Sequence, residues 1–200
     1  SLKAADVGIA MGKEGTDVAR NAADLVLTDD NFATIEKAMK EGRGIYENIR
    51  KAILFLLSSN FGEIITMLAA VLAGFPAPLK ASHILWINLI TDSLPALALG
   101  MDENDGDALM QEPPRKSSEG LFSHGGLSTT LCYGAVIGAI SLLAFLTVPY
   151  GELLKQNLPL TVRNLEKILR LGPVLNKAQT HAFTVLGISQ LMHAVGMRDT

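Results

Sequence analysis

Hydrophobic and polar positions divide the chain into a short mixed region and several long apolar stretches. In the mixed region, residues 1–30, two short apolar runs at 7–11 and 25–28 flank a glycine-bounded turn and a polar stretch. Thr16 stands where a residue that caps a helix is expected, and the polar stretch after it favours a helix. A strand, a helix and a second strand in this order predict one β-α-β step.

A polar stretch with helix-favouring residues follows at 31–51. It contains no proline, and only Gly42 and Gly44 weaken its helical tendency. The pattern predicts a long helix that leads directly into the apolar residues beginning at position 52.

Four later stretches are apolar enough to be predicted as membrane spans. They cover residues 52–74, 82–101, 125–148 and 178–197. The first contains one charged residue, Glu63, the second contains one, Asp92, and the third contains none. At 1.5 Å per residue the first would extend about 34 Å, against about 30 Å of hydrocarbon in a bilayer. The fourth is weaker, because it contains Gln190 and His193.

The connections between these stretches differ in length and character. Residues 75–80 are short and proline-rich, so we expect the first two spans to form an antiparallel hairpin. Residues 102–124 form a polar loop, and residues 149–177 form a mixed polar loop with an amphipathic stretch near 165–171. The fold class predicted is mainly α, a polytopic transmembrane helix bundle of four spans preceded by α/β structure. Buried helices of a large soluble α-protein are the alternative.

Composition agrees with a membrane protein. The chain is 48% hydrophobic and 18% charged, and its mean hydropathy of +0.29 is too high for a disordered chain. A net charge of −3 argues against a nucleic-acid partner, whereas the apolar stretches predict the lipid bilayer as one. The single cysteine, Cys132, argues against a disulfide or a structural zinc site. The chain begins at Ser1 without a signal peptide, and we expect a piece of a longer protein.

The orientation in the membrane is not fixed by charge alone. Basic residues next to the first two spans favour the cytoplasm for residues 1–51 and 102–124, but the loop 149–177 is also basic. The β-α-β region must lie where its domain folds, which places residues 1–51 in the cytoplasm.

Two carboxylates inside predicted spans are candidates for function, since a charge inside a bilayer costs several kcal/mol. Asn60 lies three positions before Glu63, and Asn88, Thr91 and Asp92 have the spacing i, i+3, i+4. Each set therefore lies on one helical face, and in a hairpin the two faces can meet. Ordinary hydrogen bonding between helices is the alternative for any one of the amides or hydroxyls.

The donor types indicate a hard cation. Carboxylate, amide and hydroxyl oxygens without sulfur or imidazole suit calcium better than zinc or copper. Calcium takes about six to eight oxygens, so backbone carbonyls, water or another segment must supply the rest. Pro95 fits this picture, because a proline inside a helix leaves the carbonyl of Thr91 without its usual partner.

Five segments of the chain form a recognisable set: LKAADVGIAMG at 2–12, ADLVL at 23–27, SNFGE at 59–63, WINLITDSLPA at 86–96 and PPR at 113–115. Together they resemble the C-terminal half of P-type cation-transporting ATPases, and above all the calcium pumps of sarcoplasmic-reticulum and bacterial type. The resemblance is strong for residues 1–122 and weaker beyond.

The resemblance implies a domain organisation. It comprises the end of the phosphorylation domain (1–30), a stalk helix (31–51), a transmembrane hairpin with the ion site (52–101), a cytoplasmic loop (102–124), a transmembrane helix (125–148), an extracytoplasmic loop (149–177) and a transmembrane helix (178–197). The spans would be the fifth to eighth of ten. The resemblance also implies the metal ligands Asn60, Glu63, Asn88, Thr91 and Asp92.

Gln190 is a further candidate ligand and a departure from the family. It stands where two-site calcium pumps have a glutamate, and its side chain is neutral. We therefore expect one Ca²⁺ per cycle.

The resemblance implies an enzyme only for the complete pump, an ATP-driven translocase that exports Ca²⁺ through the plasma membrane as a multi-pass protein. The phosphorylated aspartate and the nucleotide-binding domain would belong to the N-terminal part of the same pump, the expected partner. ATP and Mg²⁺ would bind there, and we expect neither catalytic nor cofactor-binding residues in this chain. Alternatives are a P-type pump for Mn²⁺, Na⁺ or H⁺, and a passive channel or secondary carrier.

Overall fold

The computed structural model describes residues 2–103, 106–116, 119–123 and 125–198, and its elements are mainly helical, as predicted. The chain divides into two compact units. The first comprises residues 1–47 and 103–114, and the second comprises residues 48–102 and 115–200.

The first unit contains the predicted β-α-β step, together with a short 3₁₀ turn, η1. Its elements are η1 (Leu2–Ala4), β1 (Ile9–Met11), α1 (Asp17–Ala22) and β2 (Leu25–Leu27). The two strands are parallel, with Ile9 opposite Leu25. Thr16 caps α1, because its hydroxyl oxygen accepts the backbone N–H of Ala19 at 3.2 Å. The prediction for this region is therefore confirmed.

Asp30 holds the turn after β1. Its carboxylate accepts backbone N–H groups from Gly12, Lys13 and Glu14 at 2.7, 2.9 and 2.8 Å. These hydrogen bonds, with that of Lys13 the strongest influence, keep the pKa of Asp30 below its ordinary value. The Asp30 carboxylate therefore pairs three backbone N–H groups and stabilises the turn.

Helix α2 (Ala33–Leu72) is continuous over 40 residues, as the sequence pattern predicts. In the first unit it contacts the segment containing α5 (Gly106–Gln111). The guanidinium of Arg43 donates to the carbonyl oxygens of Leu109 and Glu112 at 2.5 and 2.9 Å, and Lys40 pairs with Asp107 at 2.6 Å.

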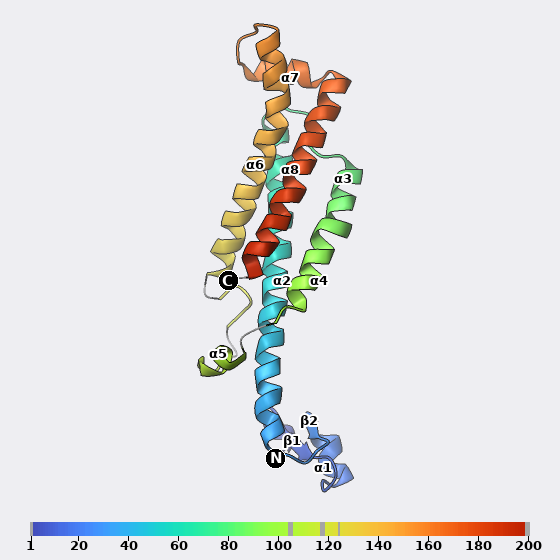
Figure 1. Cartoon of the computed structure of the whole chain (residues 1–200), viewed down its shortest axis with the longest axis vertical. Helices are drawn as coiled ribbons and strands as arrows, with labels where there is room; N and C mark the ends of the chain where they lie inside the picture. Colours follow the sequence, from blue (N-terminus) through green and yellow to red (C-terminus); the bar gives the residue numbers. More distant parts are fainter. Residues whose placement is uncertain (1, 104–105, 117–118, 124, 199–200) are drawn as a thin grey trace. The chain divides into compact units, whose positions relative to one another are not determined.

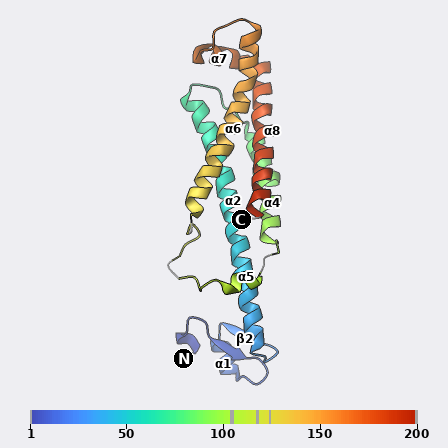
Figure 2. The same ribbon diagram turned by 60° about the vertical axis from the view of Figure 1, so that its left-hand side comes forward.

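The second unit is a helical bundle that includes the later part of α2 (Figures 1 and 2). Its other elements are α3 (Ala81–Trp86), the π-helical segment η2 (Ile87–Asp92), α4 (Ser93–Gly100), α6 (Gly126–Lys155), α7 (Val162–Leu169) and α8 (Gly172–Arg198). Helices α6 and α8 lie side by side along much of their length.

The loop expected at 149–177 is shorter than predicted. Helix α6 continues through Pro149 to Lys155, and α8 already begins at Gly172. Glu152 lies beyond the apolar stretch but still within the helix, where it forms an i, i+3 ion pair at 2.7 Å with Lys155, the last helical residue.

The second predicted span is helical from Ala81 to Gly100, but its middle is not an α-helix. A π-helical turn occupies residues 87–92 and contains Asn88, Thr91 and Asp92. It comes just before Pro95, which lacks the N–H that an α-helix would use there. The hydroxyl of Ser93 donates to the carbonyl oxygen of Asn88 at 2.8 Å.

Two described helices, α2 and α6, are long and apolar enough to cross a membrane. Helix α8 has sufficient length but more polar residues, and the second predicted span is divided into three short helical segments, α3, η2 and α4. The count of four spans therefore stays a prediction.

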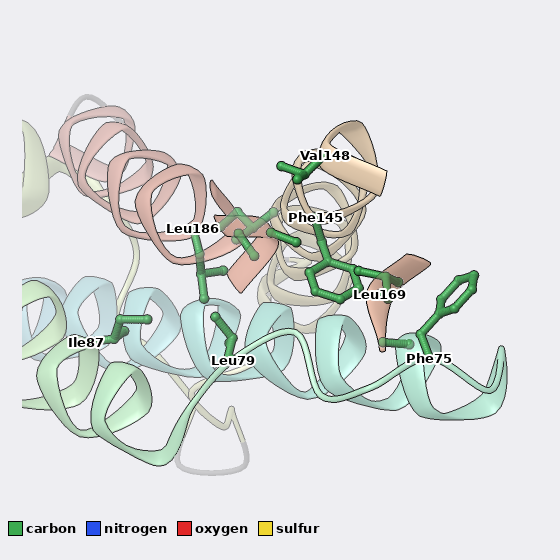
Figure 3. Packing of buried hydrophobic residues seen from close by; sticks show 11 residues of the cluster. Phe75, Leu79, Ile87, Phe145, Val148, Leu169 and Leu186 are labelled. Carbon is green, nitrogen blue, oxygen red and sulfur yellow. The ribbon is translucent and has the colours of Figure 1, made fainter. Parts of the chain in front are cut away.

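Close packing holds the bundle together. A Cβ on Gly138 of α6 would lie 3.0 Å from the carbonyl oxygen of Gly62 and 2.8 Å from Ile65 of α2, so only glycine lets these helices approach this closely. Figure 3 shows Leu79, Phe145 and Leu186 among the buried apolar side chains of the bundle.

Candidate ion-binding site

Both predicted carboxylates are buried in the second unit. Glu63 is 6% exposed on α2 and Asp92 is 2% exposed at the end of the π-helical turn, with Thr91 beside it at 8%. Helix α2 and the π-helical turn therefore each place a carboxylate in the interior of the bundle.

Gln190 joins this cluster from α8. Its side chain is fully buried, and its amide nitrogen Nε2 donates to Glu63 Oε1 at 3.3 Å. The additional candidate from the sequence is thus in direct contact with one of the two carboxylates.

Several oxygens of this region have no hydrogen-bond partner within the described part of the chain. They are both carboxylate oxygens of Asp92, the carbonyl oxygen Oε1 of Gln190 and the hydroxyl oxygen of Ser59. Buried polar atoms are nearly always paired, because leaving one unpaired costs about 1–3 kcal/mol. Unpaired oxygens on three helical segments are therefore available to a bound cation.

The two asparagines of the predicted ligand set lie differently. Asn60 is exposed, and its side-chain amide donates to the carbonyl oxygen of Leu56 in its own helix at 2.7 Å. Asn88 is also exposed. The structure therefore brings Glu63 and Gln190 together and does not bring the two asparagines into that contact, and the complete ligand set stays a prediction.

Ser59 was not among the residues selected from the sequence. It is fully buried, and it lies four positions before Glu63, which places both on one face of α2. That spacing was the available signal, but serine is common in membrane helices and alone indicates little.

Within the described ranges no group of three or more His, Cys, Asp or Glu residues is placed to hold a metal ion. The described part of this chain thus offers two buried carboxylates, Glu63 and Asp92, together with neutral oxygens. Neutral amide, hydroxyl and carbonyl oxygens are acceptable ligands for calcium, whereas zinc sites use histidine and cysteine.

Comparison with known proteins identifies the family. The description "Cation transporting ATPase, C-terminus" matches residues 76–200. The chain belongs to this family of cation-transporting ATPases. Its resemblance to the C-terminal part of P-type ATPases of calcium-pump type is confirmed, and proteins of this kind are integral to membranes.

The similar proteins of this family come from bacteria and eukaryotes. "Calcium-transporting ATPase 1" of Bacillus cereus is 53% identical over 200 residues, which is 100% of this chain and 22% of that protein. "Calcium-transporting ATPase" of Bacillus subtilis is 47% identical over 199 residues, 100% of this chain and 20% of that protein. "Endoplasmic reticulum calcium ATPase srcA" of Aspergillus fumigatus is 46% identical over 146 residues, 73% of this chain and 15% of that protein. The chain thus spans about a fifth of the length of the two Bacillus relatives.

Proposed function

We propose that this chain is the ion-binding membrane part of an ATP-driven calcium pump that exports Ca²⁺ from the cytoplasm through the plasma membrane. The observation that carries the proposal is the pair of buried carboxylates, Glu63 and Asp92, of which Asp92 has two unpaired oxygens. The names of the two Bacillus relatives, both calcium-transporting ATPases, support the choice of ion.

The charge of the site supports one Ca²⁺ per cycle. Two carboxylates neutralise one divalent cation, and Gln190 adds a carbonyl oxygen without adding charge.

The remaining ligands and partners complete the proposal. Further oxygens would come from Thr91, Asn60 and Asn88. The two asparagines would reach the cation after their helices rotate, or after they contact segments outside this chain. ATP and Mg²⁺ would be bound by the N-terminal part of the same pump, with residues 1–51 in the cytoplasm. Phosphorylation there would drive the site between an inward-open and an outward-open state.

The test is Ca²⁺-dependent ATP hydrolysis and ⁴⁵Ca²⁺ uptake by the full-length pump in inside-out membrane vesicles. We expect Ca²⁺ to stimulate both, and Asp92→Asn to reduce the stimulated rate to background. Asp6→Asn, which changes an exposed carboxylate of the first unit, is the matched control and should leave both rates unchanged.

The other outcomes separate the alternatives. Stimulation by Mn²⁺, Na⁺ or H⁺ but not by Ca²⁺ would retain the pump and overturn the ion. Cation flux without ATP hydrolysis would point to a channel or secondary carrier.

The stoichiometry is a separate expectation. Counting ⁴⁵Ca²⁺ taken up per phosphate released should give a ratio of about one for the wild-type pump. A ratio of two would contradict the argument from the neutral Gln190.

A further inference from the structure

A buried histidine lies one helical turn beyond the candidate ion site. His193 follows Gln190 by three residues on α8, so both side chains lie on the same face of the helix. His193 is 7% exposed, and its ring nitrogen Nε2 is 2.6 Å from the hydroxyl oxygen of Ser58 on α2. Nothing in the proposed ion site uses this side chain directly.

The hydrogen bonds around Ser58 favour one direction for this contact. The Ser58 hydroxyl lies 2.9 Å from the carbonyl oxygens of both Leu54 and Phe55, one turn back in its own helix. A hydroxyl has one hydrogen, and these carbonyls can only accept it. When Ser58 donates to one of them, its oxygen accepts a hydrogen bond from His193 in the tautomer that carries Nε2–H.

Aromatic rings fix the imidazole from two sides. The ring of Tyr133, on α6, lies 4.4 Å from the imidazole between centroids, and the ring of Phe55, on α2, lies 5.7 Å away. His193 is therefore held by side chains of two other helices and has little freedom to take another rotamer.

The contact of His193 with Ser58 and that of Gln190 with Glu63 join the same two helices. Along α2, Ser58 comes before Glu63, whereas along α8 His193 comes after Gln190. The two contacts therefore run in opposite order along the two helices, as expected for antiparallel helices joined at two successive turns. Two polar contacts one turn apart constrain the sliding and rotation of α8 against α2 more tightly than one contact does.

We propose that His193 is a positioning residue that sets the register of α8 on α2, so that the amide of Gln190 meets Glu63 and its carbonyl oxygen stays at the cation site. The proposal rests on the proposed function, because it assigns His193 a part in cation affinity. It predicts that loss of His193 acts through Gln190.

The test is a double-mutant cycle in the full-length pump. His193→Ala should raise the cation concentration for half-maximal ATP hydrolysis by about three- to ten-fold, the effect of one lost hydrogen bond, while the maximal rate is retained. In a Gln190→Ala background the same change should have no further effect. His193→Gln, which keeps an N–H donor of similar reach, should restore most of the affinity.

The matched control is His181→Ala, an exposed histidine of the same helix, which should leave the affinity unchanged. If His193→Ala does not accumulate in membranes, Ser58→Ala removes the acceptor without altering α8 and should give the same loss of affinity.

Two results would overturn the proposal. One is an unchanged half-maximal concentration in both His193→Ala and Ser58→Ala. The other is an equal loss in the wild-type and Gln190→Ala backgrounds, which would make the role of His193 independent of Gln190. Wild-type stimulation by Mn²⁺ rather than Ca²⁺ would overturn the proposed ion, and the same cycle run with Mn²⁺ would still decide the role of His193.

Discussion

Two aspartates in the two units are used in opposite ways. Asp30, in the α/β unit, is partly exposed and accepts three backbone N–H groups from the turn at Gly12 to Glu14. Asp92, in the helical bundle, is 2% exposed, and neither of its oxygens has a partner among the described residues. The first carboxylate satisfies the backbone and stabilises a turn, whereas the second retains its full capacity to bind a ligand. A buried and unpaired carboxylate is costly, so its presence indicates function rather than stability.

The strongest test of this difference between Asp30 and Asp92 is to neutralise each aspartate in turn. Asp92→Asn should reduce Ca²⁺-stimulated ATP hydrolysis at least about 100-fold, because the buried negative charge that attracts the cation is removed. The same change should leave the thermal stability equal or higher, since a buried charge is replaced by a neutral group. Asp30→Asn should lower the stability of the α/β unit.

Thermal inactivation in detergent and hydrogen exchange of peptides covering residues 12–14 measure these stability effects. Faster exchange at residues 12–14 in Asp30→Asn, but not in Asp92→Asn, is expected. A bundle destabilised strongly by Asp92→Asn would show that this carboxylate is structural after all.

A second experiment tests whether the close contact between α2 and α6 contributes to the stability of the bundle. Gly138→Ala introduces a Cβ against the backbone of Gly62, and overpacking of this kind costs about 1–3 kcal/mol. Gly151→Ala lies in the same helix with open space around it, and it should stabilise by up to about 1 kcal/mol because alanine favours the helix.

Midpoints of heat inactivation of the two variants should therefore move in opposite directions. Equal shifts would mean that the contact between α2 and α6 does not constrain the bundle.

The smallest expected effect is on the pH dependence of the α/β unit. The folded state lowers the pKa of Asp30, so its ionised carboxylate stabilises the fold above its unfolded value of about 3.9. This contribution is lost as the pH falls through the lowered folded-state pKa. Hydrogen exchange of residues 12–14 should accelerate below about pH 4 after correction for intrinsic rates, and Asp30→Asn should remove that acid-dependent step.

Much of the local structure could be predicted from the sequence, because it depends on neighbouring residues. Alternation of short apolar runs with a capped polar stretch predicted the parallel strands and the helix that begins after Thr16. Uninterrupted helix-favouring and apolar residues predicted the continuity of α2. Charge in an apolar stretch identified Glu63 and Asp92 as buried groups with a cost to explain.

The residues of the ion site could be predicted only in part from the sequence. Spacing along a helix gives the angle between two side chains, about 60° between Asn60 and Glu63, but it does not give the rotation of the helix toward its neighbours. That rotation placed Glu63 inward and Asn60 outward, and it also buried Ser59.

The sequence by itself determined the β-α-β step, the long helix α2 and the apolar stretches that carry Glu63 and Asp92. Only the tertiary structure decided that Gln190 meets Glu63 and that His193 contacts Ser58. The physical reason is that these two contacts join positions more than a hundred residues apart. Their geometry depends on how closely whole helices pack, as at Gly138, and no local pattern encodes that distance.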